Sequence, residues 1–172
     1  MPQAKRTIWD GLVLGVIGYA SVAILYAAFD QFAARGALYT VDMLGKTVFR
    51  GLRDTSVLGL PIERDATGML LYNGLHLAMS LAIGLVISGL IGYAERRPAQ
   101  AKLVMFVIVS GFVVTIAGVG FLTSPIRPLL PWWSIVVANT LAVFTGGTYL
   151  VWRRPDTWRK LSPFTGETEV TG

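Results

Sequence analysis

The chain has 172 residues, of which 53% are hydrophobic and only 15% are charged, and it contains no cysteine. A soluble domain normally carries about 25% charged residues, so the composition argues against a soluble fold. The missing thiols exclude disulfides and cysteine-ligated metals. The formal net charge is +5, but the basic residues lie at the ends of apolar runs and form no face with interleaved aromatic residues, which argues against nucleic-acid binding.

Most apolar residues fall in four long runs without acidic or basic side chains. An apolar run of about 18 or more residues predicts a helix that spans a membrane. We therefore predict an all-α integral membrane protein with a single transmembrane domain over residues 1–172, in which four transmembrane helices form a bundle. The predicted spans are approximately 9–30, 69–94, 103–123 and 132–152.

The first span follows Lys5 and Arg6, and its uncharged part is 19 residues long. That length exceeds the roughly 7–15 residues of a signal-peptide core, so we expect an uncleaved span. Gly11 and Gly15 form a GxxxG pair, and Gly18 continues the small face. Small residues at this spacing let helix backbones approach each other closely in a membrane.

Residues 31–68 are predicted to form an outer connection that contains a short amphipathic helix over about 41–53. Thr40 is the expected N-cap. One side of this helix is apolar, and the other carries Asp42, Lys46 and Arg50. The pattern suits a helix lying on the membrane surface or a loop helix that caps the bundle.

The second span holds the only histidine of the chain and carries small or polar residues at every fourth position. Residues four apart share a helix face, so we expect this helix to lie at the centre of the bundle. Three prolines separate the third and fourth spans, which predicts that these two are antiparallel neighbours. Over the four spans the expected helix-packing positions are Gly11, Gly15, Gly18, Ser80, Gly84, Ser88, Gly92, Gly111, Thr115, Gly118, Ser134, Ala138, Ala142 and Gly146.

Membrane orientation follows from the distribution of Lys and Arg. Nine of the fifteen lie in the N-terminal segment, in the turn after the second span and in the tail 153–172. The other six lie in the outer connection and the proline-rich turn. We therefore expect a multi-pass protein of a cell or bacterial inner membrane, with both termini and the tail cytoplasmic.

The candidate binding site is a polar layer in the outer half of the spans, formed by His76, Asn73 and Asn139 together with Tyr26 and Thr115. Polar residues inside a membrane often mark function. The simpler interpretation is interhelical hydrogen bonding, worth about 0.6 kcal/mol per contact. We expect no cofactor and no metal, and His76 is the residue that would ligate a haem or a chlorophyll-type pigment if one were bound.

Enzyme motifs are missing: the glycines form no phosphate-binding loop, and no Ser-His-Asp arrangement is suggested. The sequence favours a non-catalytic accessory or structural subunit of a larger membrane complex, such as a respiratory or photosynthetic electron-transfer assembly. Its expected partners are other membrane proteins and the lipid bilayer. One alternative is a membrane protein that binds a cofactor, pigment or quinone through His76 and the polar layer, and another is a small transporter or channel.

Reporter fusions test the orientation. Fusions after Arg97 and at the C-terminus should behave as cytoplasmic, and a fusion near Gly59 should behave as exported, because the short basic flanks all lie on one side. The opposite pattern would reverse the assignment of both termini.

Overall fold

The computed structural model describes residues 3–58 and 62–155, and within these ranges it contains helices and no strand. The long helices are α1 (Gln3–Phe32), α3 (Ala66–Arg96), α4 (Ala101–Leu122) and α5 (Trp132–Arg153), and α2 (Tyr39–Phe49) is short. Three single turns, η1 (Thr55–Val57), η2 (Pro98–Gln100) and η3 (Ser124–Ile126), lie in the connections.

Four helices in the described ranges are long and apolar enough to span a membrane, as predicted. α1 and α3 are 30 and 31 residues long, because each continues as a helix through the polar residues that flank its apolar run. Most of the predicted tail, 153–172, lies outside the described residues.

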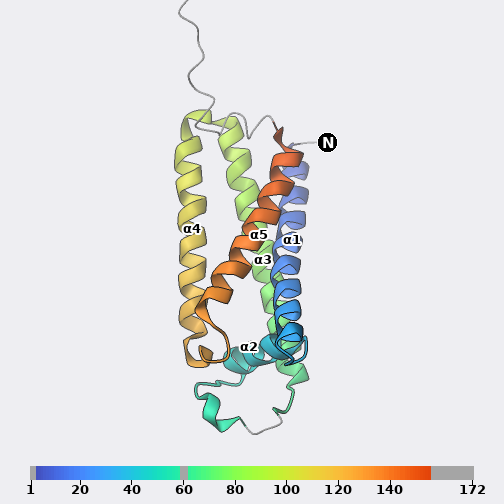
Figure 1. Cartoon of the computed structure of the whole chain (residues 1–172). Helices are drawn as coiled ribbons and strands as arrows, with labels where there is room; N and C mark the ends of the chain where they lie inside the picture. The colour runs from blue at the N-terminus through green and yellow to red at the C-terminus, as the bar shows by residue number, and fades with distance from the viewer. Residues whose placement is uncertain (1–2, 59–61, 156–172) are drawn as a thin grey trace, which may run out of the picture.

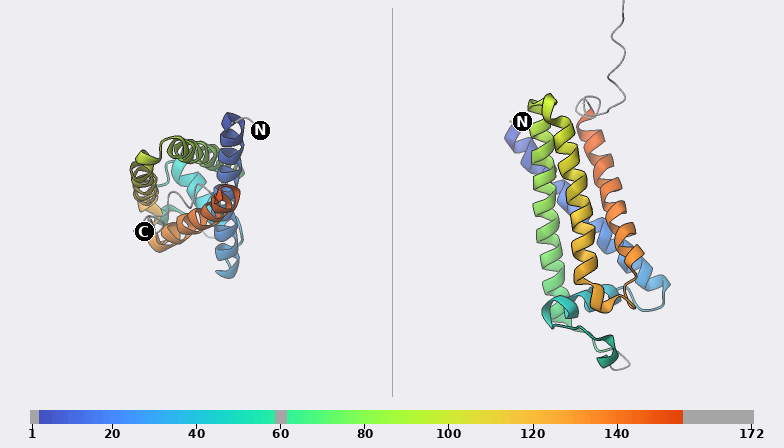
Figure 2. Two further views of the ribbon diagram at one scale, coloured as in Figure 1. Left: turned by 90° about the horizontal axis from the view of Figure 1, so that it is seen from above. Right: turned by 90° about the vertical axis from the view of Figure 1, so that its left-hand side faces the viewer.

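The long helices run alternately up and down, and α2 crosses one end of them (Figure 1). We call this the α2 end, and we call the opposite end, where α1 begins and η2 joins α3 to α4, the η2 end. α1 is inclined across α3, as the right-hand view of Figure 2 shows. It packs against both α3 and α5. The first and last described residues therefore lie at the η2 end.

α1 and α3 touch through their backbones where they cross. A Cβ atom added to Gly84 would overlap the carbonyl oxygen of Gly11 and lie 2.5 Å from the nitrogen of Gly15. A Cβ atom on Gly15 would in turn lie 2.6 Å from Cα of Leu81. Only residues without side chains fit at this crossing, so the small face of α1 and that of α3 pack against each other.

α5 also packs against α1, and a hydrogen bond between two hydroxyl groups joins the two helices. A Cβ atom on Gly146 would lie 2.6 Å from Cδ1 of Leu14. The hydroxyl oxygens of Ser21 and Thr145 lie 2.8 Å apart. Ala138 of α5 is also fully buried. Gly146 and Thr145 of α5 thus lie against α1, whereas Ala142 is only half-buried.

α4 is loosely held, and only Val104 and Gly120, one near each end of the helix, are buried. α4 and α5 are antiparallel and approach each other near η3, but they diverge toward the η2 end (Figure 1). No described atom of a neighbouring helix lies within 4 Å of the Cβ position of Gly111 or Gly118. Gly111 and Gly118 therefore make no close contact with the described part of the chain, and their role in helix packing stays a prediction.

Gly18 has no close described neighbour, and the Thr115 hydroxyl bonds within its own helix. A Cβ atom on Gly18 would have no described neighbour within 4 Å. The Thr115 hydroxyl donates to the Gly111 carbonyl of its own helix at 2.8 Å. Residue size alone does not bring a helix face to a neighbour, because the rotation of each helix decides which face is covered.

α2 lies across one end of the long helices and packs against α3 and α1. Met43 and Leu44 pack with Ile126, Leu130 and Ile135 in a buried apolar cluster. The predicted N-cap is wrong: Leu38 occupies that position without a side-chain hydrogen bond. Thr40 instead donates its hydroxyl hydrogen to Asp30 at 2.8 Å, because α2 packs on the end of α1.

Gly84→Leu tests the crossing of α1 and α3. The added side chain has no space, and overpacking costs about 1–3 kcal/mol even where some adjustment is possible. The thermal unfolding midpoint of the purified protein should therefore fall. Gly89→Leu, in the same helix as Gly84, is the matched control and should leave the midpoint unchanged, since no described neighbour lies within 4 Å of that Cβ position. Equal midpoints for the two variants would contradict the backbone contact.

Candidate functional sites

His76 lies between two tyrosine rings near the contact of α1 and α3. Its ring centroid is 5.1 Å from that of Tyr19 and 6.0 Å from that of Tyr72. The side chain is half-buried, and no hydrogen bond within residues 3–58 and 62–155 involves the imidazole. A half-exposed imidazole with open nitrogen atoms can donate or accept one hydrogen bond, or ligate a metal centre of a cofactor.

Asn73 lies one turn from His76 and is already engaged. Its amide oxygen accepts a hydrogen bond from the Tyr19 hydroxyl at 3.1 Å, and its amide nitrogen donates to the Met69 carbonyl at 3.0 Å. Asn73 therefore joins α3 to α1 beside His76. Tyr19, which sequence reasoning did not single out, completes this small cluster.

The other members of the predicted polar layer do not converge on His76 in the described contacts. Asn139 donates to the Ile135 carbonyl of its own helix at 2.8 Å. Tyr26 meets the Ser134 hydroxyl at 3.2 Å, and Thr115 bonds within α4. Similar depth in the sequence was the reason for grouping these residues, but helix rotation directs them toward different neighbours.

Two aspartates near the ends of α1 are fully buried, Asp10 at the η2 end and Asp30 at the α2 end. They are twenty residues apart in one helix, which corresponds to about 30 Å at 1.5 Å per residue. This distance matches the thickness of a bilayer hydrocarbon core, about 30 Å. Each carboxylate pairs with an arginine, so α1 carries a buried ion pair at each end of its apolar stretch.

Asp10 joins α1 to the end of α5. Arg154 places Nε and Nη2 at 2.9 and 2.8 Å from Asp10 Oδ2. The Tyr149 hydroxyl donates to Oδ1 at 3.3 Å, and Arg153 Nη2 lies 3.4 Å from the same oxygen. Both carboxylate oxygens therefore have partners from α5 and the residue that follows it.

Arg154 extends the same network to α3. Its Nη1 donates to Glu95 at 3.2 Å, and its Nη2 donates to the Ser88 hydroxyl at 3.3 Å. Ser88 donates to the Thr7 carbonyl of α1 at 2.8 Å. One buried guanidinium thus connects α1, α3 and α5. Ser88, which was predicted as a small packing residue, also supplies a polar contact.

Asp30 holds the connection from α1 to α2. It accepts hydrogen bonds from the Thr40 backbone nitrogen at 2.6 Å and from Arg35 Nη2 at 3.1 Å. Arg35 also donates to the Leu129 carbonyl at 3.1 Å, and its guanidinium lies 4.5 Å from the ring centroid of Tyr39. These contacts fix α2 and the segment after η3 against the end of α1.

The polar side of α2 is buried by the segment that precedes α3. Asp42, which was predicted on an exposed charged face, is buried and accepts from Lys46 Nζ at 2.7 Å and from the Asp65 backbone nitrogen at 2.9 Å. Lys46 also donates to the Glu63 carbonyl. Asp42 and Lys46 are therefore engaged within the chain, whereas the sequence suggested that both face outward toward a partner.

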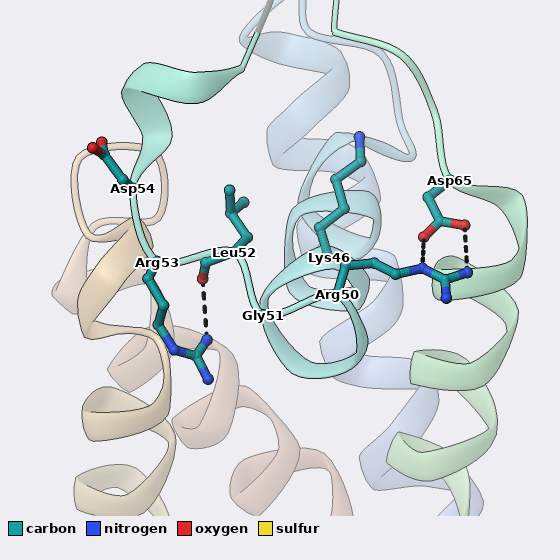
Figure 3. A pocket seen from close by; sticks show the side chains of 7 residues that line it. All are labelled: Lys46, Arg50, Gly51, Leu52, Arg53, Asp54 and Asp65. Atoms are coloured by element: carbon teal, nitrogen blue, oxygen red, sulfur yellow. Dashed lines mark hydrogen bonds and ion pairs between the residues drawn. The ribbon is translucent and has the colours of Figure 1, made fainter.

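Asp65 caps α3 and pairs with Arg50 beside a pocket at the end of α2 (Figure 3). Arg50 Nε lies 2.7 Å from Asp65 Oδ2, and the Gly68 nitrogen donates to Oδ1 at 2.9 Å. The hydrogen bond from Arg50, followed by that from Gly68, lowers the pKa of Asp65 from 3.8 to about 2. This carboxyl is therefore ionised at neutral pH, and its contacts are structural.

Sequence reasoning missed the role of Asp10 and Arg154. A usable signal was present, because Asp10 directly precedes the uncharged run of the first span and Arg154 follows that of the last. Helices that start and end at the same side of a membrane place such residues at similar depth. Opposite charges at that depth are expected to pair, since an unpaired buried charge is costly.

Comparisons with protein-family models, with curated proteins and with solved structures find no match to this chain. The described residues contain no group of three or more His, Cys, Asp or Glu side chains placed to hold a metal ion.

Asp10→Asn tests the buried network. Removing one member of a buried ion pair costs about 3–5 kcal/mol, so the thermal midpoint of the purified protein should fall strongly. Glu63→Gln should have little effect, because the Glu63 side chain is exposed. Adding Arg154→Gln to Asp10→Asn should cost less than the sum of the two single changes, because the residues interact directly. Strict additivity would contradict the coupling.

Proposed function

We propose that the chain is an integral protein of a cell or bacterial inner membrane, in which the four long helices form a transmembrane bundle with both termini cytoplasmic. We further propose that it acts as a non-catalytic accessory or structural subunit of a larger membrane complex. The candidate complex is a respiratory or photosynthetic electron-transfer assembly, by analogy of architecture alone.

Membrane insertion is supported by the large apolar side chains that cover the outside of the long helices. Ile24 of α1, Phe106 of α4 and Phe144 of α5 are each about two-thirds or more exposed. Soluble monomers rarely expose contiguous apolar surface of this extent, whereas lipid-facing helices require it.

The observation that carries the subunit proposal is the uncovered small-residue face of α4. Gly111 and Gly118 are seven residues apart, so they lie on one face about two turns from each other. Both are exposed, and no described neighbour approaches their Cβ positions. A lipid-facing helix needs only apolar residues, so glycines at this spacing are explained by a helix from another protein that packs there.

The contrast with α1 and α3 strengthens this argument. Small residues of α1 and α3 are buried where these helices cross, and there Gly11, Gly15 and Gly84 let the two backbones touch. The chain thus shows what its small-residue faces do when a partner helix is present. On α4 the corresponding face is open.

Extraction in a mild detergent tests the proposal. The wild-type chain should be recovered in a large assembly of defined stoichiometry. The double variant Gly111→Leu/Gly118→Leu should be recovered as a folded free chain, because its new side chains block a partner and not an internal contact. Ala117→Leu is the control, since Ala117 is an exposed residue on a different face of α4, and it should leave the assembly intact.

Recovery of the wild-type chain as a monodisperse monomer would contradict the subunit proposal. Selective substrate flux through such a monomer would instead support a transporter or channel. An assembly that persists in the double glycine variant would show that α4 is not the docking helix.

A second candidate function rests on His76. The imidazole has no hydrogen-bond partner among the described residues, and Tyr19 and Tyr72 flank it with aromatic surface. This arrangement suits a membrane-soluble aromatic cofactor, pigment or quinone. The visible spectrum of the same preparation distinguishes the two proposals, because a bound pigment or haem should give a band that is lost in both His76→Gln and His76→Leu.

A further inference from the structure

The two ends of the molecule differ in charge. Among the described residues the η2 end carries seven basic and two acidic side chains, whereas the α2 end carries six and five. The basic residues of the η2 end are Lys5, Arg6, Arg96, Arg97, Lys102, Arg153 and Arg154, and the acidic ones are Asp10 and Glu95. The surplus of positive charge is therefore concentrated at the end where α1 begins and α5 ends.

Two arginines of this end remain accessible although they touch the buried Asp10. Arg6 Nε lies 3.9 Å and Arg153 Nη2 lies 3.4 Å from an Asp10 oxygen, but Arg154 supplies the close ion pair at 2.8 Å. The side chains of Arg6 and Arg153 are 45% and 37% exposed. Each guanidinium has five N–H donors, so both retain donors that the described contacts do not use.

Contacts with described residues hold both arginines at the seam of α1 and α5. Arg6 Nη2 donates to the Arg153 carbonyl at 2.6 Å, which ties the first residues of α1 to the last residue of α5. Both arginines also reach the same carboxylate. Their relative position is therefore set by the fold and does not depend on two freely moving surface side chains.

Each of these arginines has an exposed tryptophan close to it in the sequence of its helix. Trp9 of α1 is 54% exposed, and Trp152 of α5 is 77% exposed. Tryptophan is enriched at the level of lipid headgroups, where its ring is partly apolar and its N–H is solvated. Directly beyond these tryptophans both helices continue as uncharged apolar surface, along which an acyl chain can lie.

We propose that Arg6 and Arg153 bind the phosphate of an anionic phospholipid at the seam of α1 and α5. Arginine forms charge-assisted, often bidentate hydrogen bonds with phosphate oxygens, and basic pockets between transmembrane helices bind anionic headgroups. The lipid is favoured over free phosphate because each arginine lies near an exposed tryptophan at the end of a long apolar helix. The inference rests on the proposed membrane insertion, but not on the proposed subunit role.

The test uses the full chain purified in a neutral detergent with added phosphatidylglycerol or phosphatidylcholine. Phosphatidylglycerol should raise the thermal midpoint and remain bound in native mass spectra, and phosphatidylcholine should do neither. Equal effects of the two lipids would overturn the proposal. Equal stabilisation by inorganic phosphate would also overturn it, since the site would then recognise the free anion. This comparison needs no variant.

Variants locate the site. Arg6→Gln/Arg153→Gln should weaken phosphatidylglycerol binding at least tenfold, measured well below the thermal midpoint so that the folded protein is titrated. Arg6→Lys/Arg153→Lys, which keeps the charge but loses bidentate geometry, should give an intermediate loss and shows whether folding is retained. The matched control is Arg64→Gln/Arg127→Gln, which removes the same charge from exposed residues at the α2 end.

The control should bind phosphatidylglycerol as the wild-type chain does. An equal loss in the control and in the Arg6/Arg153 variant would mean that only net charge matters, which would overturn the assigned site. Specific lipid binding by a chain that forms no larger assembly would leave this inference standing and contradict the subunit proposal alone.

Discussion

The backbone contact between α1 and α3 is the constraint on which the rest of the structure depends. Gly11, Gly15 and Gly84 remove the side chains that would otherwise separate the two helices. The short distance lets Ser88 donate to the Thr7 carbonyl and the Tyr19 hydroxyl donate to Asn73. A larger residue at the crossing would therefore disturb polar contacts about one to three turns away from it.

The buried ion pairs act at the ends of the same helix. Asp10 with Arg154 and Asp30 with Arg35 lie where the apolar stretch of α1 begins and ends. Burying such pairs is costly, and their main effect is often on specificity. Asp10 and Arg154 join α1 to the end of α5, whereas Asp30 and Arg35 join the end of α1 to α2 and to the segment after η3. The two pairs therefore fix the positions of α5 and α2 along the axis of α1.

α4 is the exception to this internal consistency. α1, α3 and α5 use their small residues and hydroxyl groups on one another, whereas α4 is fixed mainly near its two ends. The faces of α4 that carry Gly111 and Gly118 meet no described part of the chain. The subunit proposal attributes this open face to a partner, while the arginine pair at the η2 end concerns the surrounding lipid. The two proposals therefore use different surfaces of the same molecule.

The sequence by itself determined the four long apolar helices, the short helix between the first two and the close-contact role of Gly84, because apolar length and helical spacing are local properties. It also placed Asn73 and His76 one turn apart. Only the tertiary structure decided that Tyr19 joins them while Asn139 and Thr115 do not, that α2 buries Asp42, and that Asp10 meets Arg154. These outcomes depend on the rotation and tilt of whole helices, which many weak contacts far apart in the sequence set together.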